Sequence, residues 1–185
     1  LAKKDWEKAY EDLKMLGVGG RNLLRNSGEE RISDNKNFQP IDYEFVIEPN
    51  ELLGKIVTFS VEAKTDNGTD RFQFYPRKEG DSWRAVGEFV PTTEYRRYTH
   101  TFIYNVEDAQ VLRIRHYRYE NTGTLYVRNA KLEIRDRATD WTPAPEDIDA
   151  HPFVVELAEA VFRSKQNEER IRNVENVITA LGGGS

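Results

Sequence analysis

Apolar and polar residues alternate along most of the middle of the chain. The alternation is clearest in residues 56–63, where one side of the segment carries Val57, Phe59, Val61 and Ala63 and the other carries Thr58, Ser60 and Glu62. Because side chains of a strand point alternately to the two faces of a sheet, this pattern predicts a half-buried strand. Similar alternation recurs in six further segments, namely Tyr43–Ile47, Arg71–Tyr75, Arg84–Val90, Tyr95–Tyr104, Val111–Tyr119 and Thr124–Ile134. About eight short strands with turns between them predict an all-β, antiparallel sandwich or barrel.

The two ends of the chain have helical spacing instead. Residues 2–16 place three apolar side chains at intervals of four and three, and glycines follow; the three are Trp6, Tyr10 and Leu13. Beyond Pro152 a second apolar stripe runs through Phe153, Leu157, Val161, Ile171, Val174, Ile178 and Leu181. Its last four members have the spacing of coiled-coil core positions. We expect this helix to meet copies of itself or the N-terminal helix, with folding back onto its own sandwich as the alternative.

These patterns predict four parts. They are an N-terminal connector helix over residues 1–18, a β-sandwich over 19–147, a C-terminal oligomerisation helix over 148–181, and a linker or tag over 182–185. The segment Trp141–Asp147 contains two prolines, which push the residues before them out of the helical region. It therefore predicts an extended exit from the β domain. We expect the whole to be a piece of a longer protein.

Composition excludes several classes of protein. The net charge of -5 argues against nucleic-acid binding, which requires a basic surface. The chain has no cysteine, so disulfides and thiolate metal sites are excluded. No apolar run is long enough to span a membrane. We expect no cofactor requirement.

Catalytic motifs are absent from the sequence. The three histidines, His100, His116 and His151, have neither metal-ligand spacing nor a neighbouring nucleophile motif. His100 alternates with Phe102, which predicts a half-buried, hydrogen-bonded residue. A pair of carboxylates acting on a glycosidic bond stays open as an alternative, but most acidic residues fall in turns or at polar strand positions. We therefore expect a protein that is not an enzyme.

A row of arginine and tyrosine is predicted to face outward from the sheet. In the segment 111–119, Leu112 and Ile114 turn to the core, and the opposite side carries Arg113, Arg115, Tyr117 and Tyr119. The segment 71–75 likewise turns Arg71, Gln73 and Tyr75 outward. Aromatic rings stack on sugar rings, and arginine and amide groups reach hydroxyls, so this row is a candidate ligand-binding face, with Trp83 as an added platform. The alternatives are an ordinary solvated face for the row and an aromatic lid for Trp83.

Two segments carry a resemblance to a known family. The segment 19–27, Gly-Gly-Arg-Asn-Leu-Leu-Arg-Asn-Ser, resembles the opening of carbohydrate-binding jelly-roll modules found in tail and baseplate proteins of phages and prophages of Gram-positive bacteria. Residues 124–133, followed by 138–147, resemble the closing strand and exit segment of these modules. The resemblance covers approximately residues 19–147.

The resemblance implies a jelly-roll sandwich in a virion protein that acts outside the cell, where it adheres to host cell-wall polysaccharide. It also implies other tail proteins as partners and a homo-trimer formed through the flanking helices. Related modules hold a structural calcium ion between the first and last strands, for which this chain offers Glu29 or Glu30 but has Asn129 where an aspartate is frequent. The alternative function is a trimerising spacer of a virion fibre with no ligand of its own.

Overall fold

The computed structural model describes residues 20–34, 40–80, 84–117, 123–148 and 152–182. Residues 18–147 belong to one compact unit, and the long helix α3 (Pro152–Gly182) belongs to another. The predicted N-terminal helix over 2–16, as well as Trp83, Tyr119 and His151, lie outside the described residues.

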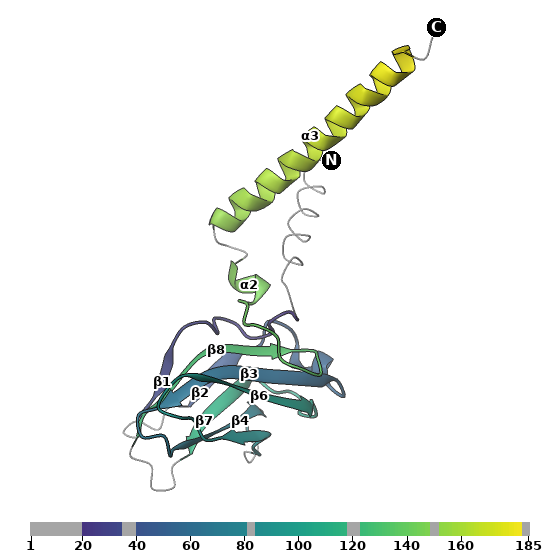
Figure 1. Ribbon diagram of the computed structural model, residues 1–185. Helices are drawn as coiled ribbons and strands as arrows, with labels where there is room; N and C mark the ends of the chain where they lie inside the picture. Colours follow the sequence, from purple (N-terminus) through teal and green to yellow (C-terminus); the bar gives the residue numbers. More distant parts are fainter. Residues whose placement is uncertain (1–19, 35–39, 81–83, 118–122, 149–151, 183–185) are drawn as a thin grey trace. The chain divides into compact units, whose positions relative to one another are not determined.

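The compact unit is a sandwich of two four-stranded antiparallel sheets (Figure 1). The first sheet has the order β1-β8-β3-β6, with bounds Arg31–Ser33, Leu125–Glu133, Ile56–Thr65 and Arg96–Ile103. The second has the order β2-β7-β4-β5, with bounds Ile41–Glu44, Val111–Tyr117, Arg71–Arg77 and Gly87–Phe89. Consecutive strands change sheet at every step except β4 to β5, and β1 pairs with β8, which is the strand order of a jelly roll. The predicted antiparallel β-sandwich is confirmed.

Aromatic side chains fill the space between the sheets. The side chains predicted to face inward from β3, including Val57, Phe59 and Val61, are fully buried. Phe59 meets Phe74 of the opposite sheet with ring centroids 4.4 Å apart. Burying each such side chain stabilises the fold by about 1.5–3 kcal/mol, so these facing rings hold the two sheets together.

The turn between β3 and β4 follows from its sequence. Gly68 adopts a φ of 68°, and its backbone N–H donates to Thr65 Oγ1 (2.9 Å). Asn67 Oδ1 accepts the backbone N–H groups of Thr69 (3.0 Å) and Asp70 (3.1 Å). Asn67 and Gly68 therefore form the turn, and a residue with a Cβ at position 68 would be strained at this positive φ.

The outer face of β3 is covered, which the alternation did not predict. Thr58 and Ser60 hold polar positions but are buried. Thr58 Oγ1 donates to the backbone carbonyl of Arg135 (2.8 Å), and Arg97 of β6 donates to Ser60 Oγ (2.6 Å). The expectation of a solvated face was wrong for these residues, because the chain leaving β8 returns across this sheet.

A buried ion pair lies under the same returning segment. Lys131 and Glu133 of β8 both have fully buried side chains, and Lys131 Nζ lies 3.5 Å from Glu133 Oε2. Lys131 Nζ also donates to Thr139 Oγ1 (2.9 Å) and to the backbone carbonyl of Asp140 (2.8 Å). Burial lowers the pKa of Lys131, and the carboxylate of Glu133 opposes that shift. The pair therefore fastens the exit segment to the sandwich.

The opening and exit segments meet at Asn22. Its Nδ2 donates to Ser27 Oγ (3.0 Å) and to the backbone carbonyls of Ala130 (3.1 Å) and Thr142 (2.9 Å). Its Oδ1 accepts the backbone N–H of Leu24 (3.1 Å). The two segments that carry the family resemblance are thus joined by one buried amide.

The exit segment ends in a short helix rather than in extended chain. Residues 141–144 have no regular structure, but α2 spans Pro145–Ile148. The prediction of an extended segment up to Asp147 was wrong at this point, because proline at the first helical position has the φ of a helix and needs no hydrogen bond there.

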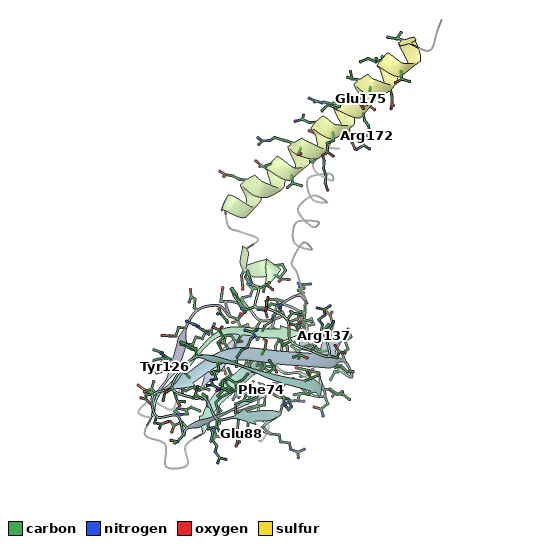
Figure 2. All side chains as sticks on the ribbon, viewed as in Figure 1. Phe74, Glu88, Tyr126, Arg137, Arg172 and Glu175 are labelled. Atoms are coloured by element: carbon green, nitrogen blue, oxygen red, sulfur yellow. The ribbon has the colours of Figure 1, made fainter. Side chains whose placement is uncertain are left out.

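The C-terminal helix α3 is confirmed as a helix. Its apolar stripe is exposed, with exposed fractions of 59% for Ile171, 58% for Val174, 62% for Ile178 and 80% for Leu181. Figure 2 shows side chains projecting from both edges of α3, with Arg172 and Glu175 labelled. None of the described helices is long and apolar enough to cross a membrane.

The buried tyrosines predict a loss of stability at alkaline pH. Burial raises the pKa of Tyr43 to about 12, and burial also raises the pKa of Tyr104. Because the unfolded phenol ionises near pH ~10, their contribution to stability is complete below that pH and is lost as the pH rises towards 12. Absorbance at 295 nm with parallel circular dichroism should show late tyrosine ionisation that coincides with unfolding. Ionisation of all nine tyrosines near pH ~10 in an intact fold would contradict this result.

Candidate functional site

The outer face of the second sheet gathers polar side chains from all four of its strands. We call it the outer face and define it by Asp42, Arg71, Gln73, Tyr75, Glu88, Arg113 and Arg115. Strand register aligns these residues in rows across the sheet. Arg113 of β7 is opposite Asp42 of β2 and Tyr75 of β4. Arg115 is opposite Gln73, which is in turn opposite Glu88 of β5.

The first row is a bidentate ion pair. Arg113 donates through Nε to Asp42 Oδ1 and through its terminal nitrogen to Asp42 Oδ2, both at 2.7 Å. The hydrogen bonds to Asp42 raise the pKa of Arg113, so the guanidinium stays charged. Because both partners are only partly exposed, the pair holds its planar donor group in one orientation.

The second row ends at a shared carboxylate. Gln73 Nε2 donates to Glu88 Oε2 (2.7 Å), and Arg71 donates to Glu88 Oε1 (3.1 Å). Gln73 Oε1 is buried and has no hydrogen-bond partner among the described residues. An unpaired buried acceptor costs about 1–3 kcal/mol, so this oxygen is energetically unsatisfied.

The structure brings five of the eight predicted binding residues together on this face. Arg71, Gln73, Tyr75, Arg113 and Arg115 come from β4 and β7, as the alternation predicted. The predicted exposure is not found throughout: Gln73, which donates to Glu88, is 8% exposed, and Tyr75, which lies opposite Arg113, is 6% exposed. Arg71 keeps 55% of its side chain exposed and Arg113 keeps 18%.

The remaining three predicted residues add no described side chain to the face. The backbone of Tyr117 ends β7 opposite Arg71. Trp83 and Tyr119 fall outside the residues that the structure describes.

The two described histidines have structural surroundings. His100 packs against Phe74 and Phe102, with ring centroids 5.7 and 6.1 Å apart, as the alternation predicted. His116 Nε2 lies 2.7 Å from Asp70 Oδ2, and the two side chains are only 3% and 1% exposed. A substrate therefore cannot reach this histidine–aspartate pair without opening the core.

The side chains named for the calcium site that the family resemblance implies have other surroundings in the structure. Glu29 and Glu30 are exposed, and the Glu30 carboxylate accepts the hydroxyl of Tyr95. Asn129 donates its amide to Glu62 Oε2 (2.9 Å). In the part of the chain that is described, no three histidine, aspartate or glutamate side chains gather as a metal site.

The sequence did not predict a cleft that lies beside β5 and the end of β6. Its volume is about 880 Å³, and its walls come from residues 53–54, 75–78, 84–86 and 102–107. Strand β5 has three residues whereas β6 has eight, so the second sheet ends before the first on this side. No local motif marks such a cleft, because four separate segments form it.

The sandwich is similar to several solved structures. No protein-family profile matches the sequence, and no curated protein matches it. The tripod from the baseplate of bacteriophage Tuc2009 is 18% identical with a TM-score of 0.42, and the match covers 70% of this chain and 60% of that chain. A variant of a family 29 carbohydrate-binding module is 10% identical with a TM-score of 0.43, over 70% of this chain and 96% of that chain. A family 29 module from Piromyces equi is 14% identical with a TM-score of 0.38, over 66% and 93%.

Proposed function

We propose that this protein is a glycan-binding adhesion module of a phage tail or baseplate protein, and that its outer face contacts host cell-wall polysaccharide. The observation that carries the proposal is the hydrogen-bonded group formed by Arg71, Gln73 and Glu88, which holds a charged donor and a charged acceptor side by side on the outer face. The resemblance of the opening and exit segments to carbohydrate-binding modules of virion proteins supports the same function.

The outer face is arranged in advance for hydroxyl groups. A polysaccharide presents many hydroxyls, each of which donates and accepts a hydrogen bond. The carboxylates of Asp42 and Glu88 are acceptors, the guanidinium groups of Arg71 and Arg113 are donors, and ion pairs hold both kinds in place. Because these side chains are already ordered, binding loses less side-chain entropy than it would on a loose surface.

Two substitutions on this face test the proposal. Gln73→Met keeps the side-chain length, Arg71→Met keeps an unbranched apolar side chain, and both remove the polar groups. We expect the double variant to bind polysaccharide fragments from Gram-positive cell walls about tenfold or more weakly, because it loses several charge-assisted hydrogen bonds. Isothermal titration calorimetry measures the affinity, and thermal melting verifies the fold.

The matched control lies on the other sheet. Arg128 of β8 is also exposed and also pairs with a glutamate, Glu62, at 2.7 Å. Arg128→Met should therefore leave the affinity unchanged. Equal losses in both variants, or binding unaffected by the outer-face substitutions, would count against the outer face.

The exposed stripe of α3 favours a second function, that of an oligomerising spacer. Counted in heptads, Ile171 and Ile178 take core position a, and Val174 and Leu181 take core position d. All four are exposed, so a single copy of α3 leaves its apolar stripe in water. We propose that copies of this helix bury the stripe against one another as a homo-trimer. The β-branched Val174 at position d shifts the preference from dimers towards trimers, whereas isoleucine at a with leucine at d is the pattern of dimers.

Charges beside the stripe support a parallel arrangement. Arg163 and Arg170 take position g, and Glu168 and Glu175 take position e; Figure 2 labels Glu175 on the helix. In a parallel bundle each g residue faces the e residue five positions later on its neighbour, which pairs each arginine with a glutamate. An antiparallel bundle would place like charges together. The spacer and the adhesion module are compatible, because several copies of a weak glycan site gain avidity when they are joined.

A further inference from the structure

The cleft beside β5 points to a second binding site. We propose that it takes an anionic carbohydrate, whose carboxylate or phosphate pairs with Arg77 and Arg84. The choice of a carbohydrate rests on the proposed function, whereas the acidic group follows from the cleft alone. The site is separate from the charged rows of the outer face, with which it shares only Tyr75.

Backbone hydrogen bonds hold the walls of the cleft in place. The backbone N–H of Gly54 donates to the carbonyl of Tyr104 (2.8 Å), which ties the segment before β3 to the end of β6. The N–H of Val86 donates to the carbonyl of Phe74 (2.9 Å), and that of Gln110 donates to the carbonyl of Arg77 (2.8 Å). The cleft is therefore formed before any ligand arrives, as binding sites for small molecules usually are.

The walls combine apolar and basic groups. Phe102 and Val106 line the cleft, and so do Leu53 and Ile103, whose exposed fractions are 37% and 63%. Exposed aliphatic side chains beside an aromatic ring provide surfaces on which the C–H faces of a sugar can pack. A volume of about 880 Å³ is within the usual range for small-ligand sites.

The charge of the cleft is opposite to that of the protein. The whole chain has a net charge of -5, but among the described residues the lining contains Arg77, Lys78 and Arg84 against one acidic residue, Glu107. Lys78 lies 3.7 Å from Asp108. Within the described part of the chain, the side chains of Arg77 and Arg84 form no hydrogen bond or ion pair. Their guanidinium groups are therefore available to an anion, for which arginine has a matching fork of donors.

Titration with small acidic and neutral probes tests the proposal. Sodium glucuronate provides the carboxylate and glycerol 3-phosphate provides the phosphate, and glucose is the neutral control. We expect one or both anions to shift the amide NMR signals of residues 77–78 and 84–86, and glucose to shift them far less. The anion that binds more tightly identifies the acidic group. Raising the salt concentration should weaken the binding, because exposed charges are screened.

Variants separate this site from the outer face. Arg77→Gln combined with Arg84→Gln should weaken anion binding about tenfold or more, whereas Arg71→Met on the outer face should leave it unchanged. The same cleft variant should still bind neutral wall polysaccharide if the proposed function holds. Unaltered anion affinity in the cleft variant, or glucose binding as tightly as glucuronate, would overturn the second site without affecting the first.

Discussion

Lys131→Met lowers the free energy of unfolding by about 3–5 kcal/mol, because it leaves a buried carboxylate without its partner. The side chains of Lys131 and Glu133 are both fully buried, so water cannot replace the lost ammonium group. The substitution also removes the hydrogen bonds from Nζ to Thr139 Oγ1 and to the carbonyl of Asp140. Chemical denaturation of the two proteins at neutral pH measures the difference.

A double variant separates the charge from the packing. Lys131→Met with Glu133→Leu removes both charges and should regain most of the lost stability, since an apolar pair of similar volume replaces a buried ion pair at little cost. Lys55→Met, at an exposed position, is the control and should change stability by less than about 0.5 kcal/mol. A loss of under about 1 kcal/mol for Lys131→Met would show that the ion pair does not fasten the exit segment.

Ile171→Asp should convert the proposed trimer into monomers. In a parallel trimer, position 171 of each helix faces the common axis, so the substitution places three carboxylates together in an apolar layer. Multi-angle light scattering should report the mass of a single chain for the variant and a threefold larger mass for the unaltered protein. Arg172→Asp, one residue along on the outer side of the heptad, should leave the mass unchanged.

Charge reversal tests the direction of the helices. Arg170→Glu should weaken association, because it places a carboxylate opposite Glu175 of a neighbouring copy. Adding Glu175→Arg should restore association in a parallel bundle, because opposite charges then face each other again. A monomeric mass for the unaltered protein would contradict the assembly, and failure of the second substitution to rescue the first would contradict the parallel arrangement.

Alternation predicted the strands well where one face of a strand is apolar and its burial depends only on residues of the same strand. It placed β3, β4 and β7 correctly and predicted that Phe72, Phe74, Leu112 and Ile114 face the core, because these directions depend only on neighbours in the same strand.

In β8 the alternation of inward and outward side chains changes phase. Asn129 adopts a φ of 51°, and the pairing with β3 shifts there, so inward positions pass from Val127 to Ala130. Such a bulge depends on the partner strand and has no signature in the sequence of β8 alone.

Burial by segments that are distant in the sequence explains what could not be predicted about the candidate site. The outward direction of Arg71 and Arg113 follows from strand period, but the burial of Gln73 and Tyr75 depends on side chains from neighbouring strands. The burial of Thr58 depends in the same way on residue 135, which is 77 positions away. The cleft depends on β5 being shorter than β6. Each of these features requires knowledge of which segments meet in space.

Two side-chain amides on opposite sheets provide the most direct test of glycan binding by the outer face. Gln73 Nε2 donates to Glu88 on the outer face, and Asn129 Nδ2 donates to Glu62 on the other sheet, at 2.7 and 2.9 Å. Both give side-chain NH₂ signals in a ¹⁵N NMR spectrum. On titration with Gram-positive cell-wall polysaccharide fragments, the Gln73 signal should shift and the Asn129 signal should stay in place. A shift of the Asn129 signal with the Gln73 signal unmoved would contradict glycan binding by the outer face, and so would no shift of either.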